Sequence, residues 1–406
     1  MATKQRYNFK EAGLGADFAQ DKLKEFKALI DTGLSFVVIS MPGVGVSYFL
    51  KYLTMQNFAH FIHVDLYSLP TLSQHEFYKL LLSELDGKPG SKTDEELLGE
   101  TKKNLKTLAE KRERIVLIFS RFDQLNKEFD WNFLSNIQSL TAVSPGKIVL
   151  IFTSTKPLHE IVPPEALAGG NLNFYSENLY FKPYFKDDLK KLLKIEPARP
   201  GLSRLTLEKL LDLSGGHNQL FHILLSSPKE QLLLDRFVKM QMKEFMDYLD
   251  YHQRKILQKM TSSASHPALD AGSIDEYLLG VGMIKQLTSE AIHLRGVTAF
   301  SSPRRCKAGG VKFELFTPLL TEYIKTNLPV KLPVKESKLF KLLRSNMGKT
   351  VTKDEIFSEV WGENEEGASD WALDALIYRL RKHPFIKAHG YIIESQKKIG
   401  YTLIQT

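Results

Sequence analysis

Residues 34–56 read LSFVVISMPGVGVSYFLKYLTMQ, and the fold of the first half of the chain can be inferred by starting from them. The opening apolar run is typical of a short strand that is buried on both faces. Gly43 and Gly45 follow it, and the residues after them have the apolar spacing of a helix. A phosphate-binding loop belongs at this place, between a strand and the helix that follows it.

The segments on either side repeat this alternation. Four further apolar runs predict strands, at 61–67, 114–120, 147–155 and 178–184, and helical patterns such as DKLKEFKALIDTG and HEFYKLLLSELDG accompany them. Continuous apolar strands separated by helices indicate a parallel sheet that is covered on both faces. We therefore predict an α/β P-loop domain, with a parallel sheet and helices on both faces, over residues 1–190.

The rest of the chain divides into three smaller predicted domains. Residues 191–250 have helical patterns, including one long run over 229–250, and predict a helical lid. Residues 251–327 predict a winged helix, in which SIDEYLLGVGMIKQL is helical with a turn at its glycines and AIHLRG and VKFELFTP are paired strands. After the linker NLPVKLPVK, residues 332–406 predict a second winged helix. The predicted fold class is an α/β P-loop domain with a helical lid, followed by two winged-helix (α+β) domains.

Composition excludes several classes of protein. Of the 406 residues, 43% are hydrophobic and 25% are charged, which is typical of globular proteins and not of disordered or fibrous chains. No apolar run approaches the ~20 residues of a membrane span, and the opening MATKQRYNFK lacks the apolar core of a signal peptide. The single cysteine, Cys306, excludes a disulfide framework and a cysteine-based zinc site. We expect a cytoplasmic protein with no membrane partner and no metal.

The basic excess lies in the last part of the chain. Residues 1–250 carry 32 Lys and Arg against 31 Asp and Glu, whereas residues 251–406 carry 23 against 16. Electrostatic attraction to phosphates is independent of sequence, so this distribution favours a polyanionic partner at the C-terminal end. The alternative is a charge that serves solubility alone.

The turn at 40–47, SMPGVGVS, meets the phosphate-loop pattern G-x-x-x-x-G-K-[ST] in part. Gly45 and Ser47 fit, but Ser40 stands at the first glycine and Val46 at the lysine. The lysine supplies charge to the β- and γ-phosphates, and a charged hydrogen bond contributes about 1.5–3 kcal/mol that valine cannot provide. The candidate nucleotide contacts here are backbone groups of Gly43, Gly45, Val46 and Ser47.

The acidic pair that holds Mg²⁺ and orients water in such hydrolases is also missing. The strand at 114–120 ends in Ser120 and Arg121 where acidic residues are expected, and Asp123 comes two or three residues too late. Thr153 is either a contact for a γ-phosphate or a strand-end cap. Because three catalytic positions depart together, we predict that the chain is not an enzyme and requires no cofactor. Binding of ATP or ADP through backbone groups is the alternative.

Residues 10–250 resemble the AAA+/STAND branch of the P-loop ATPases. The residues that carry the resemblance are MPGVGVSYFLKYL, IVLIFSRFDQL, IVLIFTST, YFKPYFKDDL and LLDLSGGHNQL. The last of these implies a lid turn near the nucleotide, where the family often has arginine or proline and this chain has His217, Asn218 and Gln219. His217 then either faces a nucleotide or caps the turn. With its departures, the domain resembles a degenerate member, a pseudo-ATPase that would serve for assembly or partner sensing.

The last domain has its own sequence signals. Thr352 and Glu355 form a predicted capping box at the start of a helix, a third helix follows and stops before Pro384, and 385–404 predict a β-hairpin. Residues 332–404 resemble the winged helix of the OmpR/PhoB family, through VWG at 360–362, LD followed by LIYRLRK, and the closing IGYTLI.

The resemblance implies that the third helix enters the major groove of double-stranded DNA and that the hairpin touches the minor groove. Carried over by position, the implied DNA contacts are Arg379, Arg381 and Lys382 on the helix, Lys397 and Lys398 in the wing, and Lys353 at the start of the second helix. Three residues depart from the family: Trp371 stands where the family often has arginine, and Leu376 and Tyr378 replace polar residues that commonly face bases. In the middle winged helix, Arg304 and Arg305 near the expected wing tip are further candidate DNA contacts or a solvated tip.

The function predicted from these patterns is a DNA-binding, transcriptional regulator on an inactive AAA+/STAND-like scaffold. One alternative is a nucleotide-binding switch or replication-initiator-like ATPase. Another is an interaction scaffold in which the winged helices contact a protein partner or a second copy of the chain.

Overall fold

The computed structural model describes residues 11–167, 177–195, 203, 205–262, 275–287, 312–327, 333–362, 369–383, 386, 391–396 and 399–405. The chain divides into two compact units. The first comprises Met1–Gln253 and Pro267–Pro318, and the second comprises Arg254–His266 and Leu319–Thr406.

The first unit is built on a five-stranded parallel sheet of order β2-β3-β4-β1-β5. The strands are β1 (Phe36–Ser40), β2 (His60–Asp65), β3 (Ile115–Ser120), β4 (Ile148–Ser154) and β5 (Asn178–Phe181). Strands β1, β3 and β4 are buried along their whole length, because helices cover both faces of the sheet. The predicted parallel α/β fold is confirmed.

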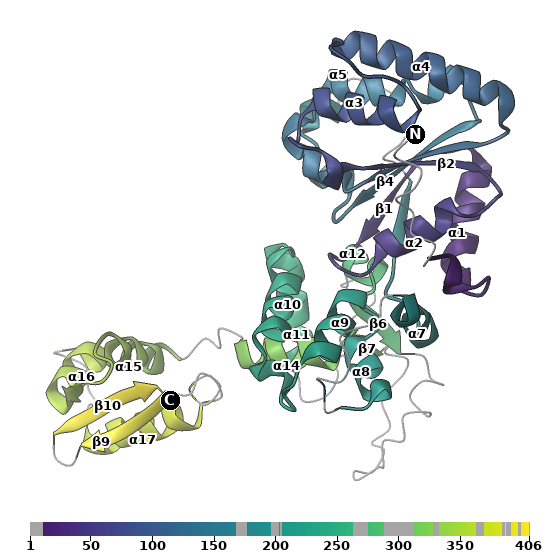
Figure 1. Cartoon of the computed structure of the whole chain (residues 1–406). Helices are drawn as coiled ribbons and strands as arrows, with labels where there is room; N and C mark the ends of the chain where they lie inside the picture. Colours follow the sequence, from purple (N-terminus) through teal and green to yellow (C-terminus); the bar gives the residue numbers. More distant parts are fainter. Residues whose placement is uncertain are drawn as a thin grey trace. The chain divides into compact units, whose positions relative to one another are not determined.

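Helices lie on both sides of this sheet, with α3, α4 and α5 on one side and α1 and α2 on the other (Figure 1). Their bounds are α1 (Gln20–Thr32), α2 (Val46–Thr54), α3 (Gln74–Glu84), α4 (Asp94–Lys111), α5 (Trp131–Gln138) and α6 (Pro164–Leu167). Local signals set several of these ends. Helix α1 ends at Gly33 in the left-handed conformation, and α4 begins with a capping box of Thr93 and Glu96.

The helical lid follows β5. It consists of α7 (Lys186–Ile195), α8 (Leu207–Ser214), α9 (Asn218–Ser226) and α10 (Arg236–Asp247). The prediction of a single long helix over residues 229–250 is wrong. A short 3-10 turn, η7 (Leu232–Leu234), comes first, and the Asp235 carboxylate then starts α10 by accepting hydrogen bonds from the N–H groups of Phe237 and Val238.

The middle region contains α11 (Tyr251–Ser262), α12 (Glu276–Gly280), β6 (Ile284–Leu287), β7 (Lys312–Leu315) and α14 (Pro318–Asn327). The segment IKQL at 284–287, expected to be helical, is instead strand β6, which pairs antiparallel with β7. The expected strand AIHLRG at 291–296 lies outside the described residues. The described part of this region therefore shows two antiparallel strands, with helices before and after them in the sequence, and a complete middle winged helix stays a prediction.

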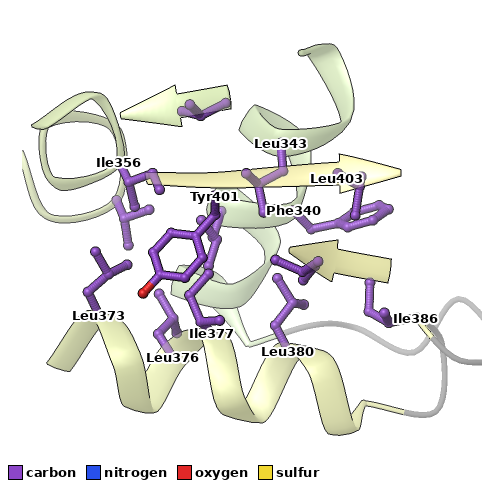
Figure 2. Packing of buried hydrophobic residues seen from close by; sticks show 14 of the residues in the cluster. Phe340, Leu343, Ile356, Leu373, Leu376, Ile377, Leu380, Ile386, Tyr401 and Leu403 are labelled. Carbon is purple, nitrogen blue, oxygen red and sulfur yellow. The ribbon is translucent and has the colours of Figure 1, made fainter. Parts of the chain in front are cut away.

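The C-terminal domain is a winged helix. Its elements are α15 (Val334–Ser345), β8 (Thr350–Thr352), α16 (Lys353–Trp361), α17 (Asp370–Lys382), β9 (Tyr391–Gln396) and β10 (Gly400–Gln405), and the strands form an antiparallel sheet of order β8-β10-β9. Figure 2 shows its core, in which Leu373, Leu376, Ile377 and Leu380 rise from α17 toward the sheet. The capping box of Thr352 and Glu355 is present as predicted.

Other short 3-10 turns are η1 (Glu11–Leu14), η2 (Leu66–Ser68), η3 (Phe122–Glu128), η4 (Thr141–Val143) and η5 (Leu158–Glu160). In the described part of the chain, no helix combines the length and the apolar character that crossing a membrane requires.

Candidate phosphate loop and nucleic-acid interface

The loop between β1 and α2 has the backbone shape that its glycines allow. Gly43 and Gly45 both have positive φ angles, +73° and +104°, and Gly45 is the residue from which α2 begins. Residues that carry a side chain rarely adopt such φ angles, so glycine is favoured at both positions. Val46, at the position of the phosphate-binding lysine, is the first residue of α2.

Four consecutive carbonyl oxygens of this loop accept hydrogen bonds from the lid or from Tyr184, which lies between β5 and the lid. The pairs are Pro42 O with His217 Nε2 at 2.8 Å, Gly43 O with Gln219 N at 3.0 Å, Val44 O with Asn218 N at 3.4 Å, and Gly45 O with Tyr184 Oη at 2.8 Å. We call these four contacts the lid clasp. The start of α9 thus binds the loop directly and holds its shape.

His217 is the buried centre of the lid clasp. Its Nδ1 atom accepts a hydrogen bond from Leu220 N at 3.2 Å, so Nε2 carries the proton donated to Pro42 O. Burial lowers the pKa of His217 to about 4, so the ring is neutral at pH 7. Of the two readings open for His217, the structure supports the cap, because the ring accepts from the first turn of α9 and is completely buried.

The carboxyl ends of β3 and β4 are occupied by contacts within the protein. Asp123 Oδ2 accepts hydrogen bonds from Thr155 N at 2.9 Å and Thr155 Oγ1 at 2.7 Å. Ser120 Oγ donates to Asp65 Oδ1 at 3.0 Å and lies 3.0 Å from His63 Nε2. These groups bind one another instead of presenting an open carboxylate pair to Mg²⁺.

Thr153 has a similar structural contact, because its Oγ1 accepts a hydrogen bond from Arg121 N at 2.8 Å. Arg121 adopts a left-handed backbone conformation, with φ of 61°, and its guanidinium lies 4.4 Å from the centre of the Tyr67 ring. Thr153 therefore holds the backbone that follows β3. This contact supports the interpretation of Thr153 as a strand-end cap.

A pocket of about 730 Å³ lies against the loop. It brings together all six residues predicted for a nucleotide site: Gly43, Gly45, Val46, Ser47, Asp123 and Thr153. The lid contributes Asn218, Gln219 and His222, and two cationic residues, Lys51 and Arg121, also line the pocket. The sequence pattern did not point to these two cations, because neither occupies a position of the phosphate-loop motif.

The residues of this pocket do not fit magnesium-bound ATP in the usual way. Val46 provides no charge, Ser120 stands where a metal-binding carboxylate is expected, and Oδ2 of Asp123 is hydrogen bonded to Thr155. Among the described residues, no group of three or more His, Cys, Asp or Glu is placed to hold a metal ion.

In the C-terminal domain, α17 has one buried face and one exposed face. Leu376 is 1% exposed and belongs to the core (Figure 2), so the expectation that it stands at a base-facing position is wrong. Trp371 and Tyr378 lie on the exposed face and are 80% and 57% exposed. The helix thus presents two aromatic rings to solvent.

The predicted DNA contacts of α17 have partners within the domain. Arg379 Nε donates to Glu336 Oε1 of α15 at 3.1 Å. Arg381 donates to β9, from Nε to Ile393 O at 2.9 Å and from an Nη atom to Ser395 Oγ at 2.7 Å. The Lys382 ammonium lies 4.4 Å from the centre of the Tyr378 ring.

The other predicted DNA contacts lie on α16 or outside the described residues. Lys353, at the start of α16, binds Asp370 at the start of α17, with 2.6 Å between Nζ and Oδ1. Lys397 and Lys398 in the wing, and Arg304 and Arg305 in the middle region, lie outside the described residues.

Comparison with known protein families gives a match for the C-terminal domain. Residues 327–403 match the family described as "Transcriptional regulatory protein, C terminal", which confirms the resemblance inferred for the last domain. Curated protein sequences give no match to the chain.

Among solved structures, the chain is similar to the Aeropyrum pernix ORC1 protein in complex with DNA, at 11% identity and a TM-score of 0.39, over 97% of this chain and 91% of that chain. It is similar to a Walker-type ATPase of Pyrococcus abyssi, at 14% identity and a TM-score of 0.45, over 76% and 95%. It is also similar to the RuvB Holliday junction branch migration motor of Thermotoga maritima, at 14% identity and a TM-score of 0.31, over 70% of this chain and 98% of that chain.

Proposed function

We propose that this chain regulates transcription by binding double-stranded DNA through its C-terminal winged helix, and that its P-loop domain is a pseudo-ATPase scaffold. The observation that carries the proposal is the C-terminal domain itself. Residues 327–403 match a family of transcriptional regulators, and the domain leaves one face of α17 exposed beside the β9–β10 hairpin. An exposed helix of this kind can enter the major groove.

Charge supports a DNA partner. The last 156 residues carry 23 basic and 16 acidic residues, whereas the first 250 are nearly balanced. Lys382 lies at the exposed C-terminal end of α17, and the exposed pair of Lys353 with Asp370 lies near its beginning. Exposed ion pairs contribute little stability, so Lys353 can exchange its carboxylate for a DNA phosphate at small cost.

The absence of hydrolysis is supported by the pocket. A P-loop hydrolase stabilises the transferred phosphoryl group with a lysine, a metal ion and a group that orients water. Here the lysine position is Val46, and the surviving carboxylate, Asp123, accepts two hydrogen bonds from Thr155. The lid clasp holds the loop through protein contacts, which is a structural role that needs no nucleotide.

The test is enrichment of bound sites from a random pool of duplex DNA by the full-length protein. Recovery of a defined motif supports a sequence-specific regulator. Lys382→Glu is expected to weaken the retention of duplex DNA, and Lys106→Glu on the exposed side of α4 is the control, because it changes the net charge equally. Failure of the wild-type protein to retain any duplex would contradict the proposal and favour winged helices that contact proteins.

The pocket favours a second candidate, which is nucleotide binding without hydrolysis. Its 730 Å³ is large enough for a small ligand, and Lys51 and Arg121 provide positive charge at its wall. Calorimetric titration with ATP, with and without Mg²⁺, tests this candidate. Saturable binding that Arg121→Ala weakens supports it, and the absence of heat at millimolar ATP rejects it.

A further inference from the structure

The exposed face of α17 carries a stripe of apolar side chains. Trp371, Ala375 and Tyr378 follow one another at intervals of four and three residues, so they lie along one side of the helix. Lys382 continues the stripe at the next interval of four. Both aromatic rings are exposed, and Ala375 between them is half-buried.

The polar groups of α17 are committed elsewhere. The Arg379 and Arg381 guanidinium groups donate to Glu336 and to β9. The two acidic side chains also have partners, because Asp370 binds Lys353 and Asp374 accepts a hydrogen bond from Tyr401 Oη at 2.6 Å. The groups best suited to reading guanine or cytosine are therefore held by the domain, and the outward stripe is left apolar.

One base edge in the major groove matches an apolar stripe. Thymine presents its C5-methyl group there, and apolar side chains contact it, whereas guanine presents two acceptors that require a donor such as arginine. Positive charge at the C-terminal end of the stripe, from Lys382, complements the phosphates that border the groove, and at the other end Lys353 can exchange Asp370 for a phosphate. A duplex fits this combination of an apolar centre and a cationic C-terminal end better than an apolar protein surface does.

We propose that Trp371, together with Tyr378, recognises thymine methyl groups in the major groove, so that this domain selects its sites by methyl contact. The inference rests on the proposed function, because it assumes that the domain binds DNA. It goes further by naming the side chains that determine specificity and the chemical group that they read. Lys382 and Lys353 then position the helix through phosphates and carry little sequence information.

The test compares two duplexes that differ in the methyl group alone. The motif enriched by the full-length protein is synthesised with thymine and with deoxyuridine, and the dissociation constants of the two duplexes are measured by fluorescence anisotropy. Each contacted methyl group is expected to contribute about fourfold in affinity, which corresponds to the burial of one CH₂-sized group. The Trp371→Ala variant is expected to lose most of this preference, because the ring that covers the methyl group is gone.

Two controls separate this reading from a general effect. Val334→Ala removes a side chain that is 75% exposed on α15 and is expected to keep the wild-type preference for thymine. Lys382→Ala is expected to weaken the two duplexes by the same factor. Trp371 is 80% exposed, so its removal leaves the core intact, and circular dichroism of the variant checks this.

Two results would overturn the inference and leave the proposed function standing. One is tight, sequence-selective binding by the wild-type protein with equal affinity for the two duplexes. The other is a Trp371→Ala variant with wild-type affinity and preference, which would assign the ring to a protein contact. Absence of binding to every duplex would reject the proposed function and this inference together.

Discussion

The Nε2 atom of His217 lies 2.8 Å from the carbonyl oxygen of Pro42, and this hydrogen bond joins the helical lid to the loop after β1. The two residues are 175 positions apart in the chain. Their contact is one of the four in the lid clasp, so the loop is held by backbone and side-chain groups of the protein itself. The lid clasp leads to two predictions about stability, the Asp123 carboxylate to a third, and the C-terminal domain to a fourth.

The first prediction concerns pH. Burial lowers the pKa of His217 to about 4 from an ordinary 6.5, so the unfolded chain takes up a proton at a pH where the folded protein does not. Stability is therefore complete above pH 6.5 and falls as the pH is lowered toward 4, by about 2 kcal/mol between about pH 7 and pH 5. Urea unfolding at the two pH values measures it. The His217→Gln variant, which keeps a donor and an acceptor, should lose about 2 kcal/mol less than the wild type, and equal losses would contradict the assignment.

The second prediction concerns packing of the lid against the loop. Gly43 and Gly146 have nearly the same φ angle, +73° and +75°, but a Cβ atom at Gly43 would overlap Gln219 Oε1, whereas nothing lies within 4 Å of one at Gly146. Gly146→Ala is expected to cost about 1 kcal/mol through backbone strain, and Gly43→Ala about 1–3 kcal/mol more through overpacking. Adding Gln219→Ala should restore part of the difference. Equal effects of the two glycine substitutions would mean that Gln219 does not pack closely against Gly43.

The third prediction concerns Asp123. Because its carboxylate accepts two hydrogen bonds from Thr155, Asp123→Ala is expected to lower the free energy of unfolding by about 2 kcal/mol. Asp123→Asn retains an acceptor and should lose less. Addition of Mg²⁺ should leave the melting temperature of the wild type and both variants unchanged. A stabilisation by Mg²⁺ that disappears in Asp123→Ala would identify the residue as a metal ligand instead.

The fourth prediction concerns the ion pair between Arg379 and Glu336. The Glu336 side chain is 6% exposed and that of Arg379 is 59% exposed, with 3.1 Å between Nε and Oε1. Arg379→Ala leaves a buried carboxylate without its partner and is expected to destabilise the domain by about 1–3 kcal/mol, and Glu336→Gln in the same chain should recover part of this. Lys382→Ala, at an exposed position, should change stability by less than about 0.5 kcal/mol. If Arg379→Ala unfolds at the wild-type denaturant concentration, the ion pair carries no stability and Arg379 is available to DNA.

Sequence reasoning located the elements whose signals are local. Strands β1, β3 and β4 are continuous apolar runs because both faces of the sheet are covered, and the start of α16 follows from Thr352 and Glu355 three residues apart. The loop at 40–47 was placed correctly between a strand and a helix for the same reason, and its six candidate residues line one pocket.

The remaining features depend on partners far along the chain. Arg379 was expected to face DNA, and the structure binds it to Glu336, which lies 43 residues earlier. Leu376 is expected from the resemblance at a base-facing position, and the structure places it in the core. The sequence of β6 fits a helix as well as a strand, because four residues are too few to separate the two periods, and its pairing with β7 decides between them.

The central claim is that the C-terminal domain binds double-stranded DNA, and a salt series tests it most directly. A fluorescent duplex pool is titrated with full-length protein at about 50, 100 and 200 mM salt, and anisotropy reports the dissociation constant at each. We predict binding that weakens steeply with salt, with a slope reduced by about one in Lys382→Ala, because each lost phosphate contact releases one fewer counterion. Unchanged anisotropy at the lowest salt concentration would contradict the claim.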